Sequence, residues 1–217
     1  MSYRYDEFTP GEIFHICTRG VESRIIFRHD SDHHRFHSLM LHCLSTEQVI
    51  SFSIALKFKQ GFARTAKGEG LVDILSYCLM PNHIHLLLKE NIEGGISKYI
   101  QRLLNSYAKY FNMSQDRSGS LFTNPFKAVL VDSYEQLLHV SRYIHLNPYV
   151  SHIVKDVFNY PWSSLNEYVG KVRKPICHKS LISSLINKDD YKKFVKDDAK
   201  YAKSLADIQH LLIDYKA

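Results

Sequence analysis

The sequence has no apolar run long enough to span a membrane, and its first residues, Met1 to Asp6, lack the apolar segment of a secretory signal peptide. Cysteine is scarce, with four residues in the chain, and none of them lies in a Cys-x-x-Cys pair. We therefore expect reduced thiols and no zinc knuckle. Together these absences favour a cytoplasmic protein that makes no use of a membrane.

Acidic residues are outnumbered by basic ones. The 217 residues include 28 Lys and Arg against 22 Asp and Glu, which gives a net charge of +6 and an isoelectric point near 9.0. Between residues 94 and 130 the only acidic residue is Asp116, among five basic ones. This distribution favours a polyanionic partner such as nucleic acid. Hydrophobic residues make up 45% of the chain, enough for a core in one domain with appendages.

Alternating and β-branched patterns predict strands at residues 11–18, 49–58, 72–79, 83–89 and 126–132. Helical periodicity predicts helices at residues 30–44, 96–111 and 133–147. For the last of these, Ser133 or Asp132 is the predicted N-cap and Pro148 the predicted stop. The resulting order, β-α-β-β-β-α-β-α, favours an α+β sandwich with helices packed on a mostly antiparallel sheet. From Lys171 the chain becomes rich in Lys and Asp. We therefore predict a main domain at 1–170 and a helical C-terminal extension at 171–217.

Two histidines stand one residue apart in the segment Met80-Pro81-Asn82-His83-Ile84-His85. Side chains alternate between the faces of a strand, so His83 and His85 point to the same side while Ile84 points into the core. Two neighbouring imidazoles can bind a divalent metal ion. The alternative is a pair of solvated histidines, since the chain has 13 of them.

A second polar pair is predicted on the helix at 133–147. Tyr143 and Asn147 are four residues apart, so their side chains are neighbours on one face of the helix. Separately, Tyr143 fits a half-buried aromatic residue and Asn147 fits a helix C-cap. Together with the histidines they suggest a catalytic site. A tyrosine can attack a phosphodiester when a metal ion, held by the two histidines and an amide oxygen, stabilises the charge that develops.

These two segments, residues 80–87 and 142–148, resemble the two signatures of single-tyrosine HUH transposases, and most closely those of REP-associated tyrosine transposases. Further similarities lie in His15 to Phe27 with its Arg19-Gly20 turn, in Gly119-Ser120-Leu121-Phe122 and in Tyr160-Pro161-Trp162-Ser163-Ser164. The resemblance covers residues 10–168. After Asn147-Pro148, and again after Arg19-Gly20, the sequence departs from the usual family pattern.

The resemblance implies a ferredoxin-like fold with the two histidines on a central strand. It implies cleavage of single-stranded DNA near an imperfect hairpin, with Tyr143 as the nucleophile and a 5′-phosphotyrosine intermediate. It assigns His83, His85 and Asn147 as ligands of Mg²⁺ or Mn²⁺, although histidine ligands favour Mn²⁺ over Mg²⁺. Such a protein is expected in the bacterial cytoplasm, associated with the nucleoid when bound to DNA, as a monomer or a homodimer.

Basic side chains are expected to contact DNA phosphates. Three of them form a stripe on the helix at 96–111, although a solvated face would look the same in sequence. Arg142, next to the predicted nucleophile, either faces a phosphate or forms a structural pair. The candidate DNA-binding residues are Lys98, Arg102, Lys109, Lys127 and Arg142.

Two other functions are compatible with the same residues. A domesticated protein would bind DNA hairpins and cleave them little. A metal-dependent hydrolase would use water in place of Tyr143, and it would be expected to place a carboxylate beside the histidines. The nearest carboxylate in sequence, Glu90, lies five residues after His85 and is therefore expected on the opposite face of the strand.

Overall fold

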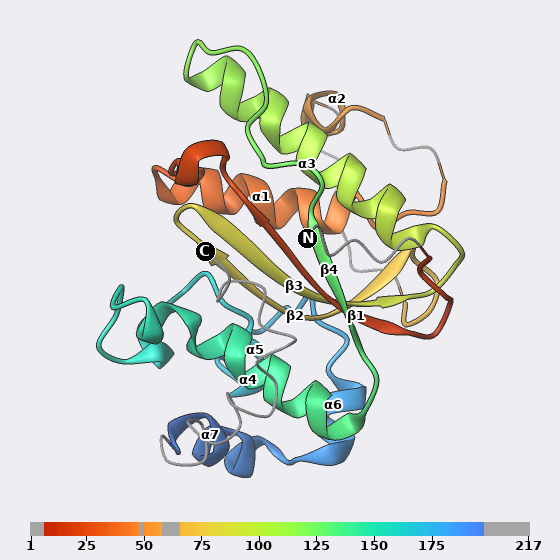
Figure 1. The fold of residues 1–217 in the computed structure, drawn as a ribbon, viewed down its shortest axis with the longest axis vertical. Helices are drawn as coiled ribbons and strands as arrows, with labels where there is room; N and C mark the ends of the chain where they lie inside the picture. The colour runs from red at the N-terminus through yellow and green to blue at the C-terminus, as the bar shows by residue number, and fades with distance from the viewer. Residues whose placement is uncertain (1–6, 48–49, 58–65, 198–217) are drawn as a thin grey trace.

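The computed structural model describes residues 7–47, 50–57 and 66–197. Its centre is a four-stranded sheet in the order β2-β3-β1-β4, and every neighbouring pair of strands is antiparallel. This confirms the predicted α+β fold with helices packed on an antiparallel sheet (Figure 1). The strands are β1 (Ile13–Arg19), β2 (Val72–Met80), β3 (His83–Glu90) and β4 (Lys127–Val131).

Helices cover both faces of the sheet (Figure 1). On one face α1 and α3 enclose the larger apolar core with Phe14, Ile84 and Leu86 from the strands. On the other face α4 packs over Cys78 and Leu87. The long helices are α1 (Asp30–His42), α3 (Gly95–Ser114) and α4 (Tyr134–Val150).

The predicted strand at 49–58 is wrong where the structure describes it, because residues Phe52–Lys57 form the short helix α2. Phe52 and Ala55 are buried while Ser53 and Ile54 are exposed. This spacing of three residues is helical, and it prevails over the strand preference of the aromatic and β-branched residues. Residues 48–49 and 58 lie outside the described part.

Helix α4 begins where the sequence predicts. Ser133 is its N-cap, and its side chain accepts a hydrogen bond from the Gln136 backbone nitrogen at 3.2 Å. Pro148 does not stop the helix, which continues to Val150. A proline this close to the end removes one backbone hydrogen bond and leaves the earlier turns intact. Asn147 therefore lies inside the helix, and Ser151, not Asn147, is the C-cap.

The chain after residue 150 forms short helices against α4 and the edge of β2. Backbone hydrogen bonds join Leu79 to Trp162 and Ser164 to Tyr77, so this segment covers part of the edge strand. The helices are α5 (Leu165–Tyr168), α6 (Ser180–Leu185) and α7 (Lys188–Lys196). Residues 198–217 of the predicted C-terminal extension lie outside the described residues. No helix in the described ranges is long and apolar enough to cross a membrane.

Candidate active site

The two histidines lie at the start of the central strand β3, on the face covered by α4. Cys17 of β1 is opposite His85 and Arg19 is opposite His83. The alternation places Ile84 in the core on the other face, as expected. Both imidazoles are buried, and their ring centroids are 5.0 Å apart. The two histidines are therefore not a solvated surface pair.

Helix α4 brings Tyr143 and Asn147 against the same histidine. The edge of the Tyr143 ring meets His85 with ring centroids 5.7 Å apart. The Asn147 amide nitrogen lies 3.2 Å from His85 Nε2. Tyr143 is only 2% exposed. Four polar side chains from two distant segments are therefore gathered between β3 and α4.

Each histidine is oriented by a hydrogen bond through its Nδ1 atom. His83 Nδ1 donates to the Asn82 side-chain oxygen at 2.6 Å. His85 Nδ1 lies 3.0 Å from Nε2 of His15, a fully buried residue of β1. With Nδ1 engaged, Nε2 is the nitrogen that each ring would offer to a metal ion. This arrangement resembles the outer partners that fix the ring of a metal-binding histidine.

The His83 and His85 imidazoles, together with the Asn147 amide, are groups that can bind a divalent cation. The described residues contain no group of three His, Cys, Asp or Glu side chains placed to hold a metal ion, so a third protein ligand would have to be of another type, such as the Asn147 amide. The amide lies against His85 Nε2, and turning it end for end would present its oxygen. Two imidazoles and one amide leave coordination positions for a substrate oxygen.

A pocket of about 350 Å³ opens beside His83. Ser151 and Ile153, which follow α4, form its far side, and Arg19 lies on the wall next to His83. The pocket therefore joins one histidine and one positive charge to the molecular surface.

Comparison with known proteins now decides the family. The model of the family described as "Transposase IS200 like" matches residues 25–147, which is more than half of the chain and includes His83, His85, Tyr143 and Asn147. The chain belongs to this family. Its members are transposases, so the protein is assigned to enzymes that cleave DNA. No curated protein matches the sequence.

A solved structure supports the fold of this transposase. The structure described as "Structure of the REP associates tyrosine transposase bound to a REP hairpin" aligns with a TM-score of 0.52 and 16% sequence identity. The alignment covers 82% of this chain and 90% of that one. At this identity the likeness speaks for the fold alone.

Within this transposase, the candidate DNA-binding residues do not form one surface around Tyr143. Lys98, Arg102 and Lys109 are on α3, across the sheet from α4. The Arg102 guanidinium donates to the backbone oxygens of Ser45 and Glu47, so it holds the loop after α1. Lys98 and Lys109 are exposed on α3, and Lys127 is exposed on the edge strand β4.

Arg142 does not reach the surface in this transposase. It is fully buried, and its guanidinium lies 4.6 Å from the Phe194 ring centroid and donates to the Asp197 carbonyl. Of the two roles considered for Arg142, the structure favours the structural one, because helix α7 covers it. His145 is also structural: it bridges Tyr191 and Ser164, and burial lowers its pKa to about 3.

Two residues near the site were missed from sequence as functional candidates. His15 and Arg19 lie on β1, far in sequence from β3, and strand pairing alone brings them next to His85 and His83. His15 lies inside the first alternating run and Arg19 directly follows it, and neither position marks a functional residue by itself. A strand known to pair with β3 would have identified both.

Proposed function

We propose that this protein cleaves single-stranded DNA near an imperfect hairpin, with Tyr143 as the nucleophile, and forms a 5′-phosphotyrosine intermediate that permits strand transfer. The observation that supports this most is the meeting of Tyr143 and Asn147 with His85 across the interface of α4 and β3. The family match supports transposition, and the hairpin named for the structural neighbour suggests the form of the DNA.

The phenol oxygen of Tyr143 attacks the scissile phosphorus, and the bond from phosphorus to the 3′ oxygen breaks. The phenolic proton passes to solvent, and the leaving 3′ oxygen takes up a proton to become a hydroxyl. His83, His85 and Asn147 would hold Mg²⁺ or Mn²⁺, and such an ion, when bound, stabilises negative charge on the phosphate. Arg19, in the pocket beside His83, contributes further positive charge.

The hydrolase alternative has little support. Glu90, the nearest carboxylate in sequence, is fully buried and accepts hydrogen bonds from the Gly95 and Ile96 backbone nitrogens at the start of α3. It caps a helix on the far face of the sheet and does not approach the histidines. This leaves Tyr143 as the better nucleophile candidate.

The test is a covalent-adduct assay on a denaturing gel. Purified protein is mixed with labelled single-stranded hairpin oligonucleotides in EDTA, Mg²⁺ or Mn²⁺. The matched variants are Tyr143→Phe and Tyr149→Phe, since Tyr149 is an exposed tyrosine of the same helix. We expect a metal-dependent shifted band in wild type and Tyr149→Phe, and none in Tyr143→Phe.

Cleavage that persists in Tyr143→Phe contradicts the nucleophile assignment and revives a hydrolase. Salt-sensitive hairpin binding without any adduct, unchanged by Tyr143→Phe, identifies instead a domesticated binding protein. In either case the protein is expected to act on DNA in the bacterial cytoplasm. Mass measurement in the same buffers distinguishes a monomer from a homodimer.

A further inference from the structure

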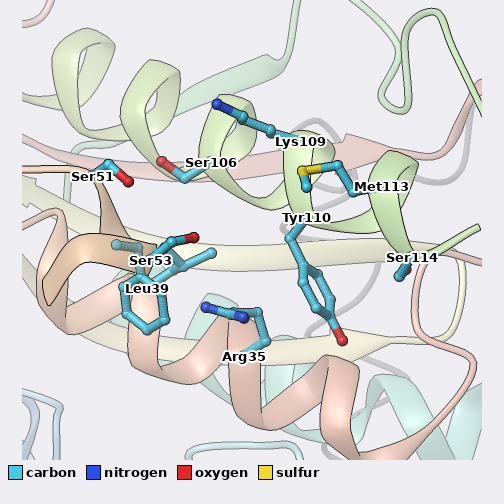
Figure 2. Close-up of a pocket in the computed structure, with 10 residues that line it drawn as sticks. Arg35, Leu39, Ser51, Ser53, Ser106, Lys109, Tyr110, Met113 and Ser114 are labelled. Carbon is cyan, nitrogen blue, oxygen red and sulfur yellow. The ribbon is translucent and has the colours of Figure 1, made fainter. Parts of the chain in front are cut away.

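A second cavity, of about 390 Å³, lies between α1, α2 and α3. In Figure 2 Arg35 rises from α1 beside the ring of Tyr110, while Lys109 and Ser106 come from α3. This cavity is on the sheet face opposite α4. It is therefore separate from the site of Tyr143 and the two histidines.

The Arg35 guanidinium is held by aromatic rings and not by an acid. Its central carbon lies 4.6 Å from the Tyr110 ring centroid and 4.8 Å from that of Phe52. Within the described residues no carboxylate forms an ion pair with it, and its side chain is half-exposed toward the cavity. The rings fix the plane of the guanidinium, while its N–H donors keep their capacity for a ligand.

The rest of the cavity wall matches an anionic ligand. Lys109 supplies a second cation and is exposed. Hydroxyl groups come from Ser51, Ser53 and Ser106, and none of the described residues that line the cavity is acidic. Asp32, three residues before Arg35 on α1, accepts a hydrogen bond from the Tyr110 hydroxyl. A cavity of this size is sufficient for a phosphate group with part of its sugar.

We infer that this cavity binds a backbone phosphate of the DNA strand at a distance from the scissile bond, with Arg35 and Lys109 as its charged contacts. The inference rests on the proposed function, because it takes the polyanion to be the DNA substrate. The sheet separates the cavity from Tyr143, so a single DNA molecule reaches both sites only by passing around an edge of the sheet. The contact therefore involves nucleotides away from the scissile phosphate. It contributes to the affinity for DNA and not to the cleavage step.

The experiment measures binding of the full-length protein to a labelled hairpin oligonucleotide with single-stranded flanks, by fluorescence anisotropy in EDTA at several salt concentrations. The variants are Arg35→Gln and Lys109→Gln. Their controls are Arg173→Gln and Lys174→Gln, which make the same changes at exposed residues outside the cavity. Lys109→Gln is informative even if Arg35→Gln impairs folding, because Lys109 is exposed. Adduct formation in Mn²⁺ is recorded for every protein.

We expect each cavity variant to weaken binding several-fold and to lower the slope of log affinity against log salt by about 0.7, the value for one lost phosphate contact on a single strand. The controls should bind as wild type does. At saturating DNA the Arg173→Gln and Lys174→Gln controls should form the Tyr143 adduct to the same extent as wild type does.

Wild-type affinity and salt slope in Lys109→Gln and in folded Arg35→Gln would overturn the inference and leave the proposed function intact. Failure of the proposed function is distinct, because wild type itself would then form no adduct. Titration with AMP and inorganic phosphate identifies the source of the phosphate. If the variants lose binding to these small molecules and keep wild-type DNA affinity, the cavity serves a free nucleotide and the DNA assignment is wrong.

Discussion

At the scale of single residues, His15 has the clearest consequence. For His85 Nε2 to face a metal ion, Nδ1 must carry the hydrogen and donate it to His15 Nε2 across 3.0 Å. We predict that His15→Leu, which has no acceptor, weakens Mn²⁺ binding by about 10- to 100-fold. His15→Gln keeps an acceptor oxygen at that position and should restore much of the affinity. Calorimetric titration of the DNA-free protein checks this, and equal Mn²⁺ affinity in His15→Leu and wild type would rule out the role.

The sequence identified some of the site residues and not others for a physical reason. His83 and His85, and likewise Tyr143 and Asn147, are related by local periodicity, which a sequence displays directly. His15 joins them only through the pairing of β1 with β3. Arg142 was open to two interpretations because its burial depends on α7, some fifty residues later. Long-range packing leaves no local pattern.

His33 gives a pH dependence whose sign follows from its burial. It stacks between the rings of Phe27 and Trp162, and burial lowers its pKa in the folded protein. The unfolded chain therefore binds a proton below about pH 6.5 while the folded state resists it, so the free energy of unfolding falls as pH falls through that value. We predict that His33→Phe, which keeps the stack, loses less stability between about pH 7 and pH 5 than wild type does. Urea unfolding at both pH values measures this, and identical losses would contradict it.

At the scale of elements, the position of α4 depends on a buried polar chain. The Tyr191 hydroxyl of α7 lies 3.0 Å from Ser141 Oγ and 2.7 Å from His145 Nδ1. His145 Nε2 then lies 2.7 Å from Ser164 Oγ, which contacts the β2 backbone. These contacts link the helix that carries Tyr143 and Asn147 to the sheet on one side and to α7 on the other.

We predict that Tyr191→Phe lowers the free energy of unfolding by about 1–3 kcal/mol, because His145 and Ser141 lose a buried hydrogen-bond partner. Tyr134→Phe is the control with the same chemical change, since Tyr134 lies on α4 and is 65% exposed. This variant should unfold as wild type does. Urea titration of both variants supplies the measurement. Equal urea midpoints for the two variants would show that the Tyr191 hydroxyl contributes nothing to stability through these contacts.

Prediction of the elements themselves succeeded where a pattern was long. The helix at 96–111 and the strands at 72–79 and 83–89 match α3, β2 and β3 to within a few residues. The segment at 49–58 is short and apolar, and such runs fit a strand or a buried helix equally well. The predicted helix end at Pro148 is wrong by a few residues, because the cost of a proline to a helix depends on how near it lies to the helix end.

At the scale of the whole molecule, the order of elements was enough to predict the fold class despite the error at 49–58. Because residues 52–57 form α2 and not a strand, the sheet has four strands, and helices connect β1 to β2 and β3 to β4. With these connections the strands lie in the order β2-β3-β1-β4. The sequence did not indicate that α4 lies on the face opposite α1 and α3. That arrangement creates the enclosed site, because only the α4 face carries His83 and His85.

The division between residues 1–170 and 171–217 remains a prediction from composition, and the packing allows a test of whether the two parts fold independently. Ile176 and Cys177 are buried in the core with α1 and α3, and Tyr191 and Val195 in the core with α4. Removing four such side chains removes roughly 6–12 kcal/mol of stabilising free energy from apolar burial. This is comparable with the total free energy of unfolding of a domain, about 5–15 kcal/mol. We predict that a fragment ending at Gly170 does not fold, whereas the full chain unfolds in one transition by circular dichroism. A fragment that melts cooperatively and forms the Tyr143 adduct would show that the C-terminal segment is dispensable and that α4 is held in place by the sheet alone.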